Sequence, residues 1–271
     1  MLLYNNQLLF EEDFALTLPN RGLFFNDGFF ETLVWAAAGI RYLPHHLARM
    51  HRAAEALGLT LPPELASAGS LTETLRKLAT GNSAYRLRLQ LWRGGGGLYT
   101  PETTDCSWLV TTRPFHAHEA PVTTAGFAES VRTRFSPVSF CKGPESLTYV
   151  LAARERVQRG LDELVLLDAT GHVAEAVAAA VFWISNGRLY TPPLETGCVA
   201  GVRRAHLLQT ARQHDLLVEE VLTQPLVLET AETVFTANVA GIRVVRQLGD
   251  VALQPDHPLL TQLRHWESQA Y

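Results

Sequence analysis

The sequence has few cysteines and no long apolar run. Its three cysteines, Cys106, Cys141 and Cys198, are far apart, and no two have the C-x-x-C spacing of a zinc or redox site. No apolar stretch reaches the roughly 18 residues that a membrane-spanning helix needs. The N-terminus lacks the basic start and apolar centre of a secretory signal. We therefore expect a cytoplasmic protein that is not associated with a membrane.

An excess of positive charge is also missing. The net charge is −4, from 23 Lys and Arg against 27 Asp and Glu, so we expect no nucleic-acid partner. Five histidines lack partners at metal-ligand spacing, so we predict no metal site; they are His45, His46, His51, His116 and His118. Hydrophobic residues make up 47% of the 271 positions, which is ample material for a core. A chain of this length forms one large or two modest domains.

Alternating helix and strand patterns predict an α+β protein of two domains. We expect a smaller N-terminal domain at 1–113, a proline-bounded linker at 114–122 and a larger cofactor-binding domain at 123–271. In the first domain the patterns predict a hairpin at 30–43, a helix ending at Gly58, a helix starting at the capping box Ser70–Glu73, and strands at 85–92 and 107–112. In the second they predict strands near 127–134 and at 164–168, an amphipathic helix at 146–159, an Asn-Gly hairpin at 182–190, a helix after Gly201 and a C-terminal helix near 257–269.

Two charged residues stand in unusual surroundings. Lys142 lies at a loop-to-helix junction, and Glu175 is the lone carboxylate of the apolar run 173–182. Both are costly to bury unless something binds them. A pyridine-aldehyde cofactor accounts for both, because a lysine forms an imine with the aldehyde and a carboxylate keeps the ring nitrogen protonated. The pair therefore points to pyridoxal 5'-phosphate.

Short motifs along essentially the whole chain surround this pair. They are Asn26–Thr32, His46–Met50, Arg93–Gly97, Lys142, Gly160–Asp168, Val173–Glu175, Tyr190–Leu194, Val199–Arg204 and Val234–Asn238. In this order they resemble the class IV aminotransferases, the fold-type IV pyridoxal-phosphate enzymes. That family includes branched-chain and D-amino-acid aminotransferases and aminodeoxychorismate lyase. The resemblance implies two α+β domains with the cofactor between them, and a homodimer.

The resemblance also implies roles for single residues. Lys142 would form the internal aldimine and then move a proton as general acid and base. Glu175 would contact the pyridine nitrogen, and Arg49 would bind the cofactor phosphate. Val199 would pack against the ring.

A second group of residues would lie by the phosphate. The backbone amides of Val202 and Arg203, at a helix start after Gly201, would form a cradle for it. Asn238 would lie beside it, unless this asparagine only shapes a turn.

Several positions depart from the family's pattern. Leu147 stands where many of its aminotransferases have a tyrosine, five residues after the lysine, and Ala180 replaces a usual asparagine. Arg203 replaces the usual threonine of the cradle, and Leu98 stands where an arginine commonly follows the glycine run. Recognition of the substrate carboxylate is therefore open. Arg86 and Arg88 are candidates, or simply exposed strand arginines.

Three functions remain. The first is an aminotransferase that passes an amino group between an amino acid and a keto acid. The second is 4-amino-4-deoxychorismate lyase, which releases pyruvate to give p-aminobenzoate. The third, from a different class, is a non-catalytic protein that binds the cofactor as a relic. Lys142 and Glu175 together argue against the third, and we place the aminotransferase first.

Overall fold

The computed structural model describes residues 1–79 and 83–269. The chain divides into two compact units: unit 1 is Met1–His116 with Cys141–Pro144, and unit 2 is Ala117–Phe140 with Glu145–Tyr271. The chain first passes from one to the other inside the expected linker. Lys142, which the sequence analysis assigns to the second domain, belongs to the short segment grouped with unit 1. No helix in the described part of the chain is long and apolar enough to span a membrane.

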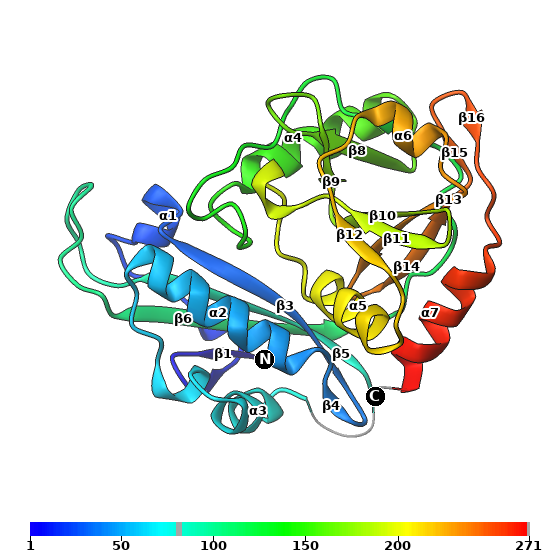
Figure 1. Ribbon diagram of the computed structural model, residues 1–271. Helices are drawn as coiled ribbons and strands as arrows, with labels where there is room; N and C mark the ends of the chain where they lie inside the picture. The colour runs from blue at the N-terminus through cyan, green and yellow to red at the C-terminus, as the bar shows by residue number, and fades with distance from the viewer. Residues whose placement is uncertain (80–82, 270–271) are drawn as a thin grey trace. The chain divides into compact units, whose positions relative to one another are not determined.

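Unit 1 is built on one antiparallel sheet with strand order β2-β1-β6-β5-β3-β4 (Figure 1). Its strands are β1 (Leu2–Tyr4), β2 (Gln7–Leu9), β3 (Gly28–Ala36), β4 (Gly39–Ile40), β5 (Tyr85–Arg93) and β6 (Cys106–Pro114). Its helices are α1 (Arg21–Phe25), α2 (Leu43–Leu57) and α3 (Ala68–Arg76), with 3-10 turns at Glu11–Asp13 and Pro63–Leu65. Helix α2 contacts β3 and lies along the sheet.

Sequence patterns account for most of this unit. The alternation in β5 buries Leu87, Leu89 and Leu91 and leaves Arg86 and Arg88 exposed, as a half-buried strand requires. Helix α2 ends at Gly58, which takes a left-handed φ of 60° as a C-cap.

The start of α3 differs from the prediction. The cap is Ser67, whose side chain accepts a hydrogen bond from the Ser70 amide at 3.1 Å, and the helix begins three residues early. Both serines can cap a helix, so local chemistry alone did not separate them. Helix α3 ends at Arg76, with Lys77 as its C-cap.

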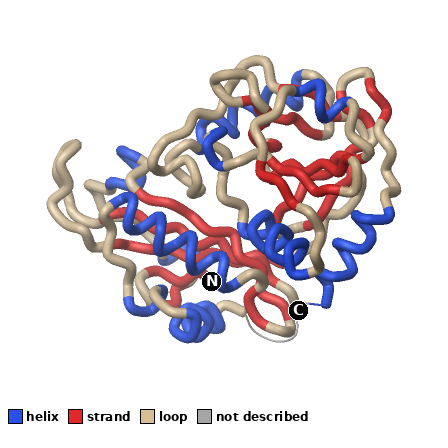
Figure 2. The backbone as a smooth tube through the Cα atoms, viewed as in Figure 1, coloured by secondary structure: helices blue, strands red, loops and turns tan. Residues whose placement is uncertain are grey.

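Unit 2 contains two five-stranded sheets, drawn as red tube in Figure 2, with orders β12-β11-β10-β13-β14 and β16-β15-β7-β8-β9. Its strands are β7 (Ala125–Phe127), β8 (Glu163–Leu167), β9 (Val173–Ala176), β10 (Ala180–Ser185), β11 (Arg188–Thr191), β12 (Val218–Glu220), β13 (Thr233–Asn238), β14 (Gly241–Val245), β15 (Gln247–Leu248) and β16 (Val251–Ala252). Its helices are α4 (Ser146–Gln158), α5 (Val202–Gln213), α6 (Pro225–Glu229) and α7 (Pro258–Gln269), with a 3-10 turn at Leu194–Thr196.

The predicted Asn-Gly hairpin forms between β10 and β11. Asn186 and Gly187 take φ values of 51° and 70°, the left-handed pair that a tight hairpin turn needs. The buried face of α5 carries Leu207, Leu208 and Ala211, as the helical spacing indicates. The α+β class is therefore confirmed.

Two predictions for unit 2 are wrong. The strand near 127–134 is only β7, which ends at Phe127, and the chain beyond it is irregular. In α4 the predicted apolar side is exposed: Leu147, Val150 and Val157 are 67%, 60% and 71% accessible. The helix instead buries Ala152 and Glu155, so periodicity identified the helix but not its inner face.

Candidate active site

Strand β3 fixes the backbone of the lysine segment. The Phe30 amide donates to the Lys142 carbonyl at 2.8 Å, and Asn26 Nδ2 donates to the Gly143 carbonyl at 2.7 Å. Gly143 has a φ of 136°, and a Cβ on it would lie 2.9 Å from Phe29 Cα, so only glycine fits this close approach. Asn26 and Phe30 thus hold the backbone at Lys142 and at the residue that follows it.

Next to this strand is a buried cluster of Glu31, His46 and Arg49. Arg49 makes two hydrogen bonds to Glu31, Nε to Oε1 at 2.7 Å and Nη2 to Oε2 at 2.5 Å. His46 Nδ1 lies 2.6 Å from Oε2 of the same carboxylate. Burial opposes ionisation of Glu31, but the charge of Arg49 and the contact with His46 outweigh it and lower the pKa of Glu31 to about 2. The carboxylate is therefore ionised.

His46 leaves one polar atom of this cluster unsatisfied. Burial lowers the pKa of His46, more than the neighbouring carboxylate raises it, so the ring is neutral at pH 7. An ionised carboxylate only accepts, so Nδ1 carries the proton and Nε2 is an acceptor. Nε2 is buried and has no hydrogen-bond partner among the described residues. A buried acceptor of this kind costs free energy unless a ligand or a water molecule binds it.

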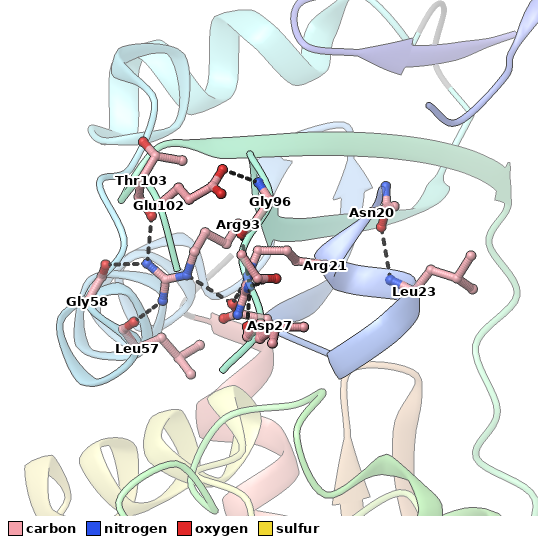
Figure 3. A network of polar contacts seen from close by, with 12 residues as sticks. Asn20, Arg21, Leu23, Asp27, Leu57, Gly58, Arg93, Gly96, Glu102 and Thr103 are labelled. Carbon is pink, nitrogen blue, oxygen red and sulfur yellow. Dashed lines mark hydrogen bonds and ion pairs between the residues drawn. The ribbon is translucent and has the colours of Figure 1, made fainter. Parts of the chain in front are cut away.

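A second buried network surrounds Asp27 (Figure 3). Asp27 Oδ2 accepts from Arg21 Nε at 2.7 Å and from Arg93 Nε at 2.9 Å. Arg21 Nη1 also binds the carbonyls of Gly96, Gly97 and Leu98 at 2.7–3.1 Å. Arg93 binds the carbonyls of Leu57 and Gly58 that end α2. One carboxylate therefore ties the glycine run to α2 and to the motif that holds the lysine segment.

In unit 2, β9 presents Glu175 as a buried carboxylate that is 5% exposed. Its Oε1 accepts hydrogen bonds from Tyr149 Oη at 2.7 Å and from the Val199 amide at 2.9 Å. Burial, and then the charge of Glu175, raise the pKa of Tyr149, so the phenol keeps its proton and donates. Val199 is itself buried.

The start of α5 has the features of an anion cradle. Gly201 is the N-cap, and a Cβ on it would lie 3.3 Å from Arg204 Cβ, which leaves little room for a side chain. Val202 and Arg203 form the first turn, whose amides have no acceptor inside the helix. The Arg203 side chain takes no part in this cradle. It makes a bidentate ion pair with Glu267 of α7, with distances of 2.7 and 2.6 Å.

The remaining predicted residues are Asn238, Arg88 and Arg86. Asn238 Nδ2 donates to the Ala178 carbonyl at 3.1 Å, and its Oδ1 accepts from the Ala240 amide at 2.9 Å, as in a turn asparagine. Arg88 lies over the Phe30 ring, 3.6 Å from its centre, and the partial loss of solvent around it, followed by the charge of Arg86, lowers its pKa. Arg86 is exposed on the same strand.

Sequence reasoning missed several of these contacts. The sequence patterns gave no role to Glu31 or to Tyr149, and they marked His46 only as a histidine without a partner at metal-ligand spacing. The spacing of His46 and Arg49, three residues apart on one helix, indicates a shared face and was the available signal. The partners of Glu175 had no such signal, because Tyr149 and Val199 are 26 and 24 residues away.

Comparison with known proteins decides the family. The sequence model of class IV aminotransferases matches residues 28–248. The chain belongs to the class IV aminotransferase family. It is 25% identical over 252 residues to the D-alanine aminotransferase of Bacillus licheniformis, covering 89% of this chain and 86% of that protein.

Class IV structures with the same fold span different activities. The 4-amino-4-deoxychorismate lyase of Pseudomonas aeruginosa aligns with a TM-score of 0.84 and 26% identity, over 99% of this chain and 97% of that one. The branched-chain aminotransferase of Thermobaculum terrenum, in its PLP-form, aligns with a TM-score of 0.83 and 18% identity, over 99% and 92%. The family is therefore settled, while its members differ in reaction.

Proposed function

We propose that this protein is a pyridoxal-phosphate-dependent aminotransferase that acts on an amino acid and a keto acid. The observation that carries the proposal is Glu175, a buried carboxylate held by two donors in a class IV aminotransferase. A carboxylate of this kind matches the charge of a protonated pyridine nitrogen. By membership of the family we also propose a homodimer, and by cysteine usage a cytoplasmic location.

Each unit by itself carries groups that fit this cofactor chemically. Unit 1 offers the amine of Lys142, the buried arginine Arg49, and the unsatisfied Nε2 of His46, which shares the Glu31 carboxylate with Arg49. Unit 2 offers Glu175 for the ring nitrogen, the apolar Val199 for the ring, and the first amides of α5 after Gly201 for the phosphate. When bound, pyridoxal phosphate supplies an aldehyde that condenses with amines and a ring that accepts an electron pair.

The chain's own groups would then divide the remaining work. Lys142 Nζ would bind the aldehyde and, once displaced by the substrate amine, would take a proton from the substrate Cα and deliver it to the former aldehyde carbon of the cofactor. Glu175 would hold the proton on the ring nitrogen. Arg49 and the α5 amides would keep the phosphate, and hence the ring, in place. Arg86, Arg88 and Asn238 remain candidates for substrate and phosphate contacts.

The test uses the unusual scarcity of lysine. Lys77 and Lys142 are the only two lysines of the chain. We expect the protein to bind added pyridoxal phosphate with a visible absorption band, and borohydride to fix the cofactor to the peptide that contains Lys142. Lys142→Ala should keep weak non-covalent binding but lose turnover by many orders of magnitude, while Lys77→Ala, a change at an exposed lysine, should behave as wild type. A colourless protein that takes up no cofactor would refute the proposal.

The lyase is the second candidate, favoured by one structural observation. Leu147 is exposed at the position of the family's usual tyrosine, so no phenol acts from that position. An aminotransferase should lose its absorption band with an amino acid alone and regain it with a keto acid. A lyase should release pyruvate from aminodeoxychorismate without this exchange, and that result would reverse the order of the two candidates.

A further inference from the structure

Tyr149 occupies a position that the family resemblance does not assign. It lies two residues after Leu147 on α4, and a helix turns about 100° per residue, so the two side chains point to nearly opposite sides. Leu147 is 67% exposed, whereas Tyr149 reaches inward to Glu175. Tyr149 is therefore not a shifted copy of the family's tyrosine.

The bond from Tyr149 is directed at the carboxylate that the proposed function needs. Its Oη donates to Glu175 Oε1 at 2.7 Å, and the Val199 amide donates to the same oxygen at 2.9 Å. The donors come from a helix and from the segment before α5, so they fix the carboxylate from two directions. Donors to a buried carboxylate also stabilise its charged form. The carboxylate of Glu175 is then a weaker base, so a proton that it shares with a ring nitrogen stays on the nitrogen.

We propose that Tyr149 is a positioning residue that orients Glu175 and keeps it ionised, and so keeps the proton on the ring nitrogen of a bound pyridine cofactor. The inference rests on the proposed function, because it deepens the role of Glu175. The phenol that acts in this chain is then that of Tyr149, which bonds the Glu175 carboxylate. It stands in place of the family's usual tyrosine, whose position Leu147 occupies.

The surroundings of Tyr149 suit a substitution test. Tyr149 lines a pocket of about 360 Å³ in unit 2, together with Arg134, Thr148 and Gly197. Tyr149→Phe removes the hydroxyl and keeps the aromatic ring. Tyr190→Phe is the matched control, since Tyr190 stacks on Trp183 in the other sheet of the same unit, with ring centres 5.5 Å apart.

The experiment reads the ring nitrogen directly. Wild type, Tyr149→Phe, Tyr190→Phe and Glu175→Gln are loaded with pyridoxal phosphate labelled with 15N in the ring, and the 15N resonance gives the ratio of protonated to unprotonated ring. We expect this ratio to fall about tenfold in Tyr149→Phe, equivalent to about 1.4 kcal/mol. We also expect kcat to fall by a similar factor with KM little changed, and Tyr190→Phe to match wild type.

The outcomes separate this inference from the proposed function. If Glu175→Gln changes the resonance but Tyr149→Phe does not, Tyr149 only packs and the inference is wrong. If neither changes it, the role of Glu175 in the proposed function fails. Should Tyr149→Phe not fold, 3-fluorotyrosine at position 149 keeps the ring and makes a more acidic donor. It should raise the protonated fraction, and an unchanged or lower fraction would overturn the inference.

Discussion

The Asp27 network gives the sharpest prediction about stability. Asp27 Oδ2 is the shared acceptor of Arg21 and Arg93, whose side chains are 5% and 7% exposed. Asp27→Asn keeps the shape and removes the charge, which leaves two buried guanidinium groups without an anion. Removal of one partner from a buried ion pair costs about 3–5 kcal/mol. We expect the stability of unit 1 to fall by an amount within this range. The backbone carbonyls still accept hydrogen bonds from both arginines in the variant, but they carry no negative charge.

Urea unfolding at pH 7 measures this loss, and Glu11→Gln is the matched control. Glu11 pairs with Arg113 at 3.1 Å, but these side chains are 50% and 62% exposed, so the control should change stability by no more than about 0.5 kcal/mol. A loss below about 1 kcal/mol in Asp27→Asn would refute the reasoning, since it would mean that the carbonyls alone satisfy the two arginines.

The contribution of Asp27 to stability depends on pH in a defined direction. Burial raises the pKa of Asp27, but the hydrogen bonds from Arg93 and Arg21 outweigh burial and lower it overall. A lowered folded-state pKa contributes stability that is present above the unfolded value of about 3.9 and is lost as the pH falls through the folded value. The difference between wild type and Asp27→Asn should therefore be full at neutral pH and shrink in acid.

Two further predictions concern the buried carboxylates Glu31 and Glu267. Glu31→Gln should destabilise the protein by about 3–5 kcal/mol at pH 7, because it removes the anion that pairs with the buried Arg49. Since the pKa of Glu31 is about 2, its contribution to stability should begin to fall near pH 4.5 and be lost only as the pH approaches 2. A pH-independent difference in stability between wild type and variant would contradict this. Glu267→Gln should cost unit 2 a similar amount, because it removes the negative charge and one of the two oxygens that accept from Arg203. Glu219→Gln at the exposed pair with Arg188 should cause no measurable loss in the same urea titration. Equal effects at the two pairs would show that burial is not the cause.

The sequence alone determined the features that depend on neighbouring residues. The left-handed Gly58 cap, the Asn186-Gly187 turn and the alternation in β5 follow from local backbone preference and from a period of two, which are set within a few residues. The ordered motifs also identified the family, which the match over 28–248 confirms. Lys142 and Glu175 stood out because a lysine and a carboxylate beside apolar stretches need a partner.

Only the tertiary structure decided which distant residues meet. Arg203 pairs with Glu267, 64 residues later, and Glu175 receives its donors from two separate segments. Helical periodicity could not say which side of α4 faces inward, because burial depends on where the sheet lies and not on the helix itself. Hydrogen bonds within an element repeat at fixed spacing, whereas ion pairs between elements depend on strand order and register, and no spacing in the sequence encodes those.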